Sequence, residues 1–430
     1  MTDLLELVIE KTIYNGYSLC RHNGIVIFTR WGVPGDKVKI KILEKKRNYY
    51  LGEIISTLEK SSNHITPLCP YFSICGGCHM QNMTYETQLN EKQNIVKESA
   101  SRFKSTRNID IRTIIPSIKQ INYRNKAQLP YDKKNKVFGF YKLNTHEIVH
   151  IKDGCKIQDE MIDENINILN NIVKTEEYWD HISHIVFRKE NDGIFLIIIM
   201  DRKYDNLNFI KYIKNLKGVY LNINTLDGNK IFGDEYIHIS GERFMTVNYF
   251  NESFKLYPWL FLQVNSSMTE KLYTNAIQAL DIDKNSKVID GYCGIGITSI
   301  LMARKVKKVI SIEYDPMSIV SLGINANSKN INNIKSYQGD IKEILIKNRA
   351  IKGNKILIDP PKKGLTRETI KELLRRNPEK IVYISCNPQT LMRDIDTILK
   401  YGQYECEYIQ PYDLFPQTFH MENIAVISKI

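Results

Sequence analysis

The carboxy-terminal third of the chain alternates short apolar runs with longer segments of helical character. The short runs predict strands, and strand–helix alternation indicates a parallel, doubly wound α/β sheet. The expected strands and helices are, in chain order, Lys287–Asp290, Thr298–Arg304, Lys308–Glu313, Pro316–Asn327, Lys355–Asp359, Arg367–Arg376, Lys380–Ser385 and Gln389–Leu399. Because ligands of such sheets bind beyond the carboxyl ends of the strands, we expect the functional site at that edge.

The first 59 residues follow a pattern that is typical of a small all-β unit. Ile25–Phe28, Val38–Ile42 and Tyr49–Ile55 are rich in residues that favour strands, with turn signals between them. Lysines and arginines are interleaved here with tyrosines. Small barrels with basic and aromatic surfaces bind nucleic acid. The alternative interpretation is a basic face that only contacts solvent.

The middle of the chain predicts a mixed domain. A helical segment is expected at Tyr85–Arg102, followed by strand-like runs at Lys136–Tyr141, His184–Arg188 and Ile194–Met200. Strands of this kind, without regular alternation with helices, favour an α+β domain in which most strands are antiparallel.

Length and composition agree with a folded protein of several domains. The chain has 430 residues, 43% of them hydrophobic and 25% charged, which is too long for one ordinary core. Its longest strongly apolar run, Ile194–Met200, is far shorter than a membrane span, and its amino-terminal residues lack the pattern of a signal peptide. A cytoplasmic protein without membrane contact is therefore expected. The formal net charge of +12 makes a polyanionic partner plausible, although a compositional bias would give the same charge.

A glycine-rich loop follows the first strand of the predicted sheet. The loop, Gly291–Gly296, would let the backbone turn tightly beside a ligand, and Glu313 at the end of the next strand could accept hydrogen bonds from a ribose. These features do not by themselves separate a nicotinamide cofactor from S-adenosylmethionine. Ser299 occupies the position of the third glycine in a GxGxxG motif, which disfavours a dinucleotide. Asp340 could face an adenine or could cap a helix that begins at Ile341.

Candidate reactive residues follow two later strands. Asp359 opens a rigid turn that contains Pro360 and Pro361, and Cys386 stands at the end of the strand Lys380–Ser385. A buried structural role is usual for an isolated cysteine, but a turn at a strand end favours a nucleophile, and cationic neighbours there could increase its thiolate fraction. Glu422 precedes the final strand and could be a base, a salt-bridge partner or a surface residue.

Three cysteines, Cys69, Cys75 and Cys78, lie within ten residues of one another, and Cys155 could complete a set of four. This spacing favours a metal site over structural cysteines. Four thiolates suit either zinc or an iron–sulfur cluster.

Several short motifs together resemble one family. GYCGIG, DPPKKGL, SCNPQTLMRD and HMENIAVI occur in this order after FLQVN, YRNKAQ and the cysteine cluster. This combination resembles the bacterial RNA 5-methyluridine methyltransferases, which include RumA-type enzymes of ribosomal RNA and TrmA-type enzymes of transfer RNA. The resemblance covers essentially the whole chain.

The resemblance implies three domains. Residues 1–59 would form a TRAM domain, an OB-like RNA-binding barrel, and residues 60–260 a central α+β domain with an iron–sulfur site. Residues 261–430 would form a Rossmann-like methyltransferase domain that binds S-adenosylmethionine. TrmA-type enzymes lack the barrel and the cluster, so the resemblance favours the RumA-type branch and 23S rRNA as the substrate, with no protein partner implied.

The resemblance also assigns residues to roles. The residues that it places at the cofactor are Gln263, Tyr292, Glu313, Asp340 and Asp359. The ligands that it implies for a [4Fe–4S] cluster are Cys69, Cys75, Cys78 and Cys155. Cys386 would be the nucleophile that adds to C6 of uracil, and Glu422 the base that removes the C5 proton. Ile297 departs from the pattern, because some relatives have Asn there near the methionine end of the cofactor.

Three alternative functions stand beside this one. The first is a transfer RNA uridine C5-methyltransferase with the same mechanism. The second is a non-catalytic RNA-binding iron–sulfur protein with a decayed methyltransferase domain, which the retained Cys386, Asp359 and Glu422 disfavour. An N6-adenine methyltransferase is disfavoured as well, because Lys362 follows the two prolines where a stacking ring is expected.

Overall fold

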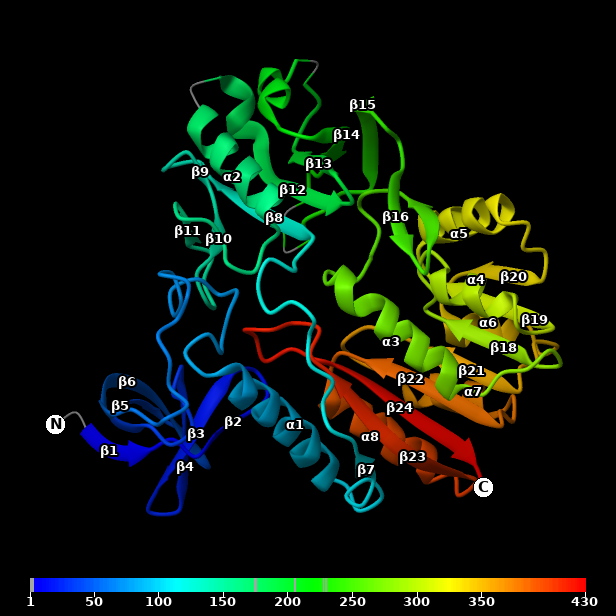
Figure 1. Ribbon diagram of the computed structural model, residues 1–430, viewed down its shortest axis with the longest axis horizontal. Coiled ribbons are helices and arrows are strands. Elements are labelled where there is room, and N and C mark those ends of the chain that lie inside the picture. The colour runs from blue at the N-terminus through cyan, green and yellow to red at the C-terminus, as the bar shows by residue number, and fades with distance from the viewer. Residues whose placement is uncertain (1–3, 174–175, 205, 227, 229) are drawn as a thin grey trace.

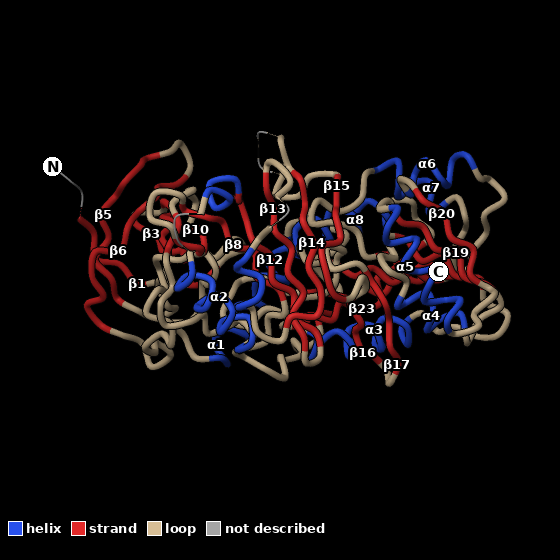
Figure 2. The backbone as a smooth tube through the Cα atoms, turned by 90° about the horizontal axis from the view of Figure 1, so that it is seen from above, coloured by secondary structure: helices blue, strands red, loops and turns tan. Residues whose placement is uncertain are grey.

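The computed structural model describes residues 4–173, 176–204, 206–226, 228 and 230–430. Its elements form an amino-terminal sheet, a central sheet and a carboxy-terminal sheet with helices, shown from blue to red in Figure 1. In the perpendicular view of Figure 2 the amino-terminal sheet and the carboxy-terminal helices lie at opposite ends of the molecule. None of the helices in the described part of the chain is long and apolar enough to cross a membrane.

The amino-terminal sheet has the strand order β1-β5-β6-β4-β3-β2. The strands are β1 (Leu4–Val8), β2 (Lys11–Thr12), β3 (Tyr17–His22), β4 (Ile25–Arg30), β5 (Lys37–Lys45) and β6 (Tyr49–Glu59). Lysine and apolar residues alternate in β5, so the side chains of Val38 and Ile40 point into a small core. Cys20 of β3 and Ile27 of β4 belong to the same core. The three runs expected from the sequence lie within β4, β5 and β6.

The central sheet has the strand order β15-β14-β13-β12-β8-β9. The strands are β8 (Lys126–Asp132), β9 (Val137–Phe138), β12 (Ile182–Glu190), β13 (Gly193–Met200), β14 (Leu216–Ile223) and β15 (Glu235–Gly241). β13 and β14 are parallel, and the other neighbouring pairs are antiparallel. β13 is buried along its whole length, which explains its continuous apolar sequence.

Smaller elements surround the central sheet. They are α2 (Glu160–Ile172), the 3₁₀ helices η1 (Glu177–His181) and η2 (Asn208–Tyr212), the hairpin of β10 (Phe140–Tyr141) and β11 (Ile148–Val149), and the hairpin of β16 (Met245–Tyr249) and β17 (Glu252–Leu256). The core beneath α2 joins Ile162, Ile166 and Leu169 of this helix to Leu129 and Phe187 of the sheet. The mixed, mostly antiparallel architecture agrees with the pattern read from the sequence.

The carboxy-terminal sheet has the strand order β20-β19-β18-β21-β22-β24-β23-β7. The strands are β18 (Lys287–Gly291), β19 (Lys308–Glu313), β20 (Ile334–Gln338), β21 (Lys355–Ile358), β22 (Lys380–Ser385), β23 (Tyr404–Tyr412), β24 (Glu422–Lys429) and β7 (Asp110–Ile111). The helices are α3 (Ser266–Ala279), α4 (Ile297–Ala303), α5 (Pro316–Ser328), α6 (Ile341–Lys347), α7 (Arg367–Leu374) and α8 (Pro388–Leu399). The strands β20 to β22 in this order are parallel, as the alternation predicted, whereas β24 is antiparallel to both β22 and β23.

Residues before the central sheet also belong to this carboxy-terminal layer. α1 (Tyr85–Ser101) packs along α8, and β7 pairs with β23. A fully buried ion pair joins Lys92 of α1 to Asp413 just after β23 (N–O 2.5 Å). The predicted grouping of residues 60–260 therefore differs from the packing, in which β7 joins the carboxy-terminal sheet and α1 covers α8.

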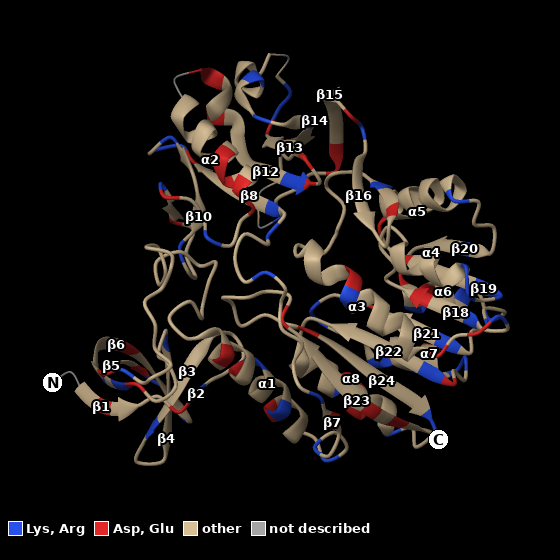
Figure 3. Ribbon diagram, viewed as in Figure 1, with Lys and Arg blue, Asp and Glu red and all other residues tan. Residues whose placement is uncertain are grey.

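The two edges of the parallel sheet carry different residues. At the amino-terminal edge, Lys287 of β18 is paired in register with Lys308 of β19, and Figure 3 shows basic residues at these strands. The carboxyl edge faces the rest of the molecule and holds the site described next.

Candidate active site

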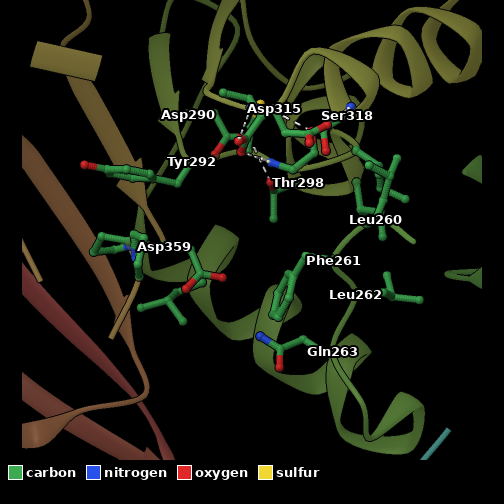
Figure 4. Close-up of a pocket in the computed structure, with 18 of the residues that line it drawn as sticks. Leu260, Phe261, Leu262, Gln263, Asp290, Tyr292, Thr298, Asp315, Ser318 and Asp359 are labelled. Atoms are coloured by element: carbon green, nitrogen blue, oxygen red, sulfur yellow. Dashed lines mark hydrogen bonds between the residues drawn. The ribbon is translucent and has the colours of Figure 1, made fainter. Parts of the chain in front are cut away.

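A cavity of about 520 Å³ lies at the carboxyl ends of β18, β19, β21 and β22, and its volume is in the range of cofactor sites. Of the residues that the sequence predicted for cofactor or catalysis, those that line it are Gln263, Tyr292, Glu313, Asp359, Cys386 and Glu422. In the close-up of Figure 4, Phe261 and Gln263 lie on the side of the cavity opposite Asp359. The topology thus brings Gln263 and Glu422, which are about 160 positions apart in the sequence, to the same cavity.

The loop after β18 closes one side of the cavity. Tyr292, Gly294 and Gly296 have φ angles of 62°, 53° and 82°, in the left-handed region. A Cβ atom on Gly296 would approach the side chain of Leu322 to 2.5 Å, so the turn into α4 requires glycine there.

Asp290, the residue before this loop, lines the same cavity and was not singled out from the sequence. Its Oδ2 accepts hydrogen bonds from the hydroxyls of Thr298 (2.8 Å) and Ser299 (2.5 Å). Burial raises the pKa of Asp290 to about 6 in spite of these bonds, and the nearby charge of Glu313 adds to the effect. An acid that ends an apolar strand directly before a glycine loop is the signal that could have identified it.

Two of the three acids predicted for the cofactor, Glu313 and Asp340, occupy different positions. Glu313 lines the cavity, and its carboxylate accepts hydrogen bonds from the backbone N–H groups of Gly294 (3.0 Å) and Asp315 (2.9 Å). Asp340 caps α6 by accepting a hydrogen bond from the N–H of Glu343 (3.2 Å). Asp340 is not one of the described residues that line the cavity.

The reactive residues are buried and electrostatically coupled. Burial first, and then the charges of Asp290 and Glu313, raise the pKa of Asp359 to about 7. The pKa of Glu422 lies well above its ordinary value because of burial and of Asp359. Among the described residues, none hydrogen-bonds to Oε2 of Glu422.

The surroundings of Cys386 differ from the expectation that cations would favour its thiolate. Burial, Glu422 and Asp359 together raise the pKa of Cys386 to about 12, and they outweigh the opposing charge of Lys362. The group is therefore a thiol, because burial and two carboxylates outweigh one cation. A positive ligand in the cavity would shift this balance toward the thiolate.

Hydrogen bonds fix Cys386 relative to the proline turn. The side chain of Asn387 caps α8 through the N–H of Gln389 (3.0 Å) and donates to the carbonyl of Lys362 (3.1 Å). Asn423, next to Glu422, donates to the carbonyl of Ser385 (3.1 Å). The residues on both sides of the cysteine are therefore tied to the turn and to β24.

The segment that carries Gln263 is held from the central sheet. The buried guanidinium of Arg188 donates to the carbonyls of Pro258 (3.1 Å) and Leu260. Asn125 donates to the carbonyl of Gln263 (3.3 Å). Phe261, which sequence reasoning missed, is 69% exposed although it lines the cavity.

The four cysteines predicted as ligands line a second, small cavity together with Arg124. Burial is the main cause that raises the pKa of both Cys78 and Cys155 to about 12. Within the described ranges, no three His, Cys, Asp or Glu side chains are grouped so that they could hold one metal ion. The structure thus gathers the thiols around one space without forming a site for a single ion.

The fold is shared with a solved enzyme. The tRNA (uracil-54, C5)-methyltransferase of Pyrococcus abyssi, solved with S-adenosyl-L-homocysteine, superposes with a TM-score of 0.75 over 98% of this chain and 100% of that one, at 21% identity. The chain therefore has the fold of this α/β methyltransferase, with the cavity at the strand ends.

Sequence comparisons narrow the class. Residues 84–430 match the family model of tRNA (uracil-5-)-methyltransferases, so the chain belongs to that family. An uncharacterized RNA methyltransferase of Halalkalibacterium halodurans is 31% identical over 99% of this chain and 97% of its own length. One of Staphylococcus aureus N315 is also 31% identical, over 98% and 97% respectively. The protein is an RNA methyltransferase.

Proposed function

We propose that this enzyme transfers a methyl group from S-adenosylmethionine to C5 of a uridine, with Cys386 as covalent nucleophile and Glu422 as base. The observation that carries the proposal is the convergence of Cys386, Glu422 and Asp359 on the cavity that Gln263 and Glu313 also line. No single motif supplies this arrangement, which depends on the ends of several strands.

The chemistry of uracil explains why a thiol and a base are needed. C5 of uracil is a weak nucleophile until a thiolate adds to C6 and moves electron density onto C5 and O4. The Cys386 thiolate forms the S–C6 bond, and C5 then takes the methyl group that the cofactor supplies as an electrophile. Glu422 removes the C5 proton, the C5–C6 double bond forms again, and the thiolate of Cys386 leaves. The uridine must be unstacked for this attack.

The charges in the cavity support a cationic cofactor. Asp290, Glu313, Asp359 and Glu422 line it, and the pKa values of Asp290, Asp359 and Glu422 are raised. A sulfonium would offset this excess of carboxylates. Gln263, Tyr292, Glu313 and Asp359 would hold the cofactor, and Asp340 would act on that end of the site through its charge beside Tyr292. The S-adenosyl-L-homocysteine of the Pyrococcus abyssi structure is consistent with this choice.

We infer that the cysteine cavity holds a [4Fe–4S] cluster and not zinc. Cys69, Cys75, Cys78 and Cys155 all line it, whereas the thiols are not grouped for one ion. Zinc needs its four sulfurs about 2.3 Å from one centre, whereas a cluster spaces its ligands more widely. Arg124 in the same cavity would offset part of the negative charge of the thiolates. Methyl transfer has no redox step, so the group would have a structural or RNA-positioning role.

We infer that the RNA is 23S rRNA and that the amino-terminal sheet, as a TRAM barrel, binds it. The basic residues of β5 and the cysteine cavity support this choice. Transfer RNA is the second candidate, and a specific observation favours it. The Pyrococcus abyssi enzyme, a tRNA methyltransferase, shares the fold over 98% of this chain, so the amino-terminal sheet does not by itself distinguish the two RNAs.

RNA with 5-fluorouridine tests the proposal. After methyl transfer, C5 would hold fluorine in place of the proton, so elimination stops and RNA remains bonded to Cys386. We expect a denaturation-resistant protein–RNA band that requires S-adenosylmethionine and maps to Cys386. Using fluorinated 23S fragments and fluorinated transfer RNA in parallel identifies the substrate. Absence of the band with both RNAs, while ordinary uridine is methylated, would exclude the covalent mechanism.

A further inference from the structure

Tyr14 belongs to the amino-terminal sheet but is buried in the core of the carboxy-terminal sheet. It lies in the turn between β2 and β3, and only 8% of it is exposed. Its ring packs edge-on against Phe419, with 5.4 Å between ring centroids. Phe419 is three residues before Glu422, so the turn reaches the region of the active site from a distant part of the chain.

The turn that carries Tyr14 is held in place on several sides. The N–H of Ile13 donates to the carbonyl of Tyr17 (2.8 Å), and the N–H of Thr12 donates to Glu91 of α1. Gly16 has a φ of 70°, and a Cβ there would lie 3.0 Å from both His79 and Phe419. The close approach of the turn to Phe419 thus requires glycine at position 16.

The hydroxyl of Tyr14 is buried, and no described residue hydrogen-bonds to it. Buried hydroxyls normally find a partner, because an unpaired one loses its hydrogen bond to water without compensation. Oε2 of Glu422 is unpaired in the same way within the described part of the chain. A polar ligand that enters the site in the working enzyme would give both groups a partner.

Charges place Tyr14 beside the reactive residues. After burial, the main causes that raise the pKa of Tyr14 are the negative charges of Cys386 and Glu422. Nζ of Lys362, which lines the cavity, lies 5.8 Å from the centroid of the Tyr14 ring. Tyr14 is not among the described residues that line the cavity, but its ring lies beside Lys362, which does line it. The phenol keeps its proton and can therefore act as a hydrogen-bond donor.

We propose, on the basis of the proposed function, that the Tyr14 hydroxyl donates a hydrogen bond to O4 of the target uracil. When the Cys386 sulfur bonds to C6, the π electrons of the C5–C6 bond move to C5 and O4, and O4 becomes an enolate oxygen. Glu422 is proposed to remove the proton from C5, and C5 is bonded to C4, which carries O4. A donor close to Glu422 is therefore in a position to reach O4. The proton stays on Tyr14 throughout, and the hydrogen bond strengthens as charge develops.

This role makes the amino-terminal sheet part of the catalytic site as well as a candidate RNA-binding surface. The strongest oxyanion contact would come from a residue outside the 84–430 region that matches the family model. Binding of RNA to the sheet and completion of the active site would then be one event.

Tyr14→Phe removes the hydroxyl and keeps the ring against Phe419. We expect the single-turnover rate of methyl transfer, and the rate of adduct formation with 5-fluorouridine RNA, to fall by about 100-fold, as for loss of one oxyanion donor. The dissociation constants for S-adenosylmethionine and RNA should change by less than about twofold. The melting temperature should stay the same or rise, because an unpaired buried hydroxyl is removed.

Tyr404→Phe is the matched control. Its buried hydroxyl donates to the carbonyl of Pro378 (3.1 Å), away from the cavity. This variant should melt at a lower temperature and react at the normal rate. A Tyr14→Phe protein with the normal rate, or one whose melting temperature falls like that of Tyr404→Phe, would overturn the proposal.

RNA with 4-thiouridine at the target places the contact. Sulfur at C4 accepts hydrogen bonds weakly, so the ratio of rates between native enzyme and Tyr14→Phe should shrink by about tenfold on this substrate. An unchanged ratio would exclude O4 as the acceptor. If native enzyme forms no adduct with 5-fluorouridine RNA, the proposed function fails. If it does and Tyr14→Phe forms adduct equally fast, only the role of Tyr14 fails.

Discussion

The cavity at the strand ends and the cysteine cavity differ in the charge and the support of the residues that line them. The first has Asp290, Asp359 and Glu422 on the rigid edge of a parallel sheet. The second is built by loops and contains thiols whose pKa values are raised by burial, as for Cys155. A cationic ligand stabilises the first by charge alone, whereas the second must lose protons to bind a metal group. Positions on the sheet should therefore determine rate, and positions in the loops should determine occupancy and stability.

Cys386→Ala gives the largest expected effect. Removal of the nucleophile should lower the rate of methyl transfer by about 10⁴-fold or more, as for other covalent nucleophiles. Cys406→Ala is the matched control, since Cys406 lies on β23 and its thiol contacts the carbonyl of Tyr408. Methyl incorporation into RNA measures both. A Cys386→Ala enzyme that methylates uridine at the native rate would rule out the covalent mechanism.

Glu422→Gln should lower turnover by about 10²- to 10⁴-fold, the range for a general base. Addition and methyl transfer remain possible, so adduct should accumulate even with ordinary uridine. In the native enzyme the pKa of Glu422 is raised, and the base acts in its ionised form, so product release should speed up as pH rises. Release by Glu422→Gln at the native rate would require a different base.

Cys155→Ser tests the cysteine cavity separately from the cavity at the strand ends. It should remove the iron and sulfide, about four of each in the native protein purified without oxygen, and should lower the melting temperature. The affinity for S-adenosylmethionine should persist, because the residues proposed to hold it line the other cavity. Cys20→Ser, in the amino-terminal core, should keep the iron. Stoichiometric zinc without sulfide in the native protein would contradict the cluster.

Lys39→Gln combined with Lys41→Gln should weaken RNA binding moderately. Both lysines lie on β5. If each contacts one phosphate, the slope of log affinity against log salt should fall by about 0.7 to 0.9 for each lysine. Binding at several salt concentrations measures this slope. An unchanged slope would assign these lysines to a face that contacts only solvent.

Asp290→Asn should give the smallest effect, visible as pH-dependent stability. The folded pKa of about 6 exceeds the usual value, so the ionised carboxylate destabilises the protein above that pH, and this cost disappears as pH falls toward the unfolded pKa of about 3.9. The gain in unfolding free energy from Asn should therefore be about 1 kcal/mol larger at pH 8 than at pH 5. Denaturant titration of both proteins without ligand measures the difference. An equal gain at both pH values would indicate a normal pKa for Asp290.

The parts of the fold that follow local patterns could be predicted from the sequence. The bounds predicted for β19 and β22 match the structure, because each is an apolar run between a charged start and a polar end. Strand order in a parallel sheet is constrained by topology, so the convergence of Tyr292, Glu313 and Asp359 was predictable. Asp290 was missed because its role depends on Thr298 and Ser299 in the next helix.

Long-range packing accounts for what remained out of reach. The short strand β7 has no pattern of its own and exists because it pairs with β23, almost 300 residues later. Tyr14 resembles any turn residue in the sequence, and only the packing on Phe419 connects it to the site. Cationic neighbours were expected to favour the thiolate of Cys386, whereas burial and the carboxylates of Glu422 and Asp359 raise its pKa.

The packing of α1 on α8 also has a consequence for the order in which the chain folds during synthesis. The ribosome releases α1 and its buried Lys92 long before α8 and Asp413 exist. A lysine that is buried in the finished protein must therefore stay hydrated while some 300 further residues are translated. The central sheet, whose core is formed by residues 127–221, has its partners first and can fold on the ribosome. The catalytic layer closes only after β24, which carries Glu422, has emerged from the ribosome.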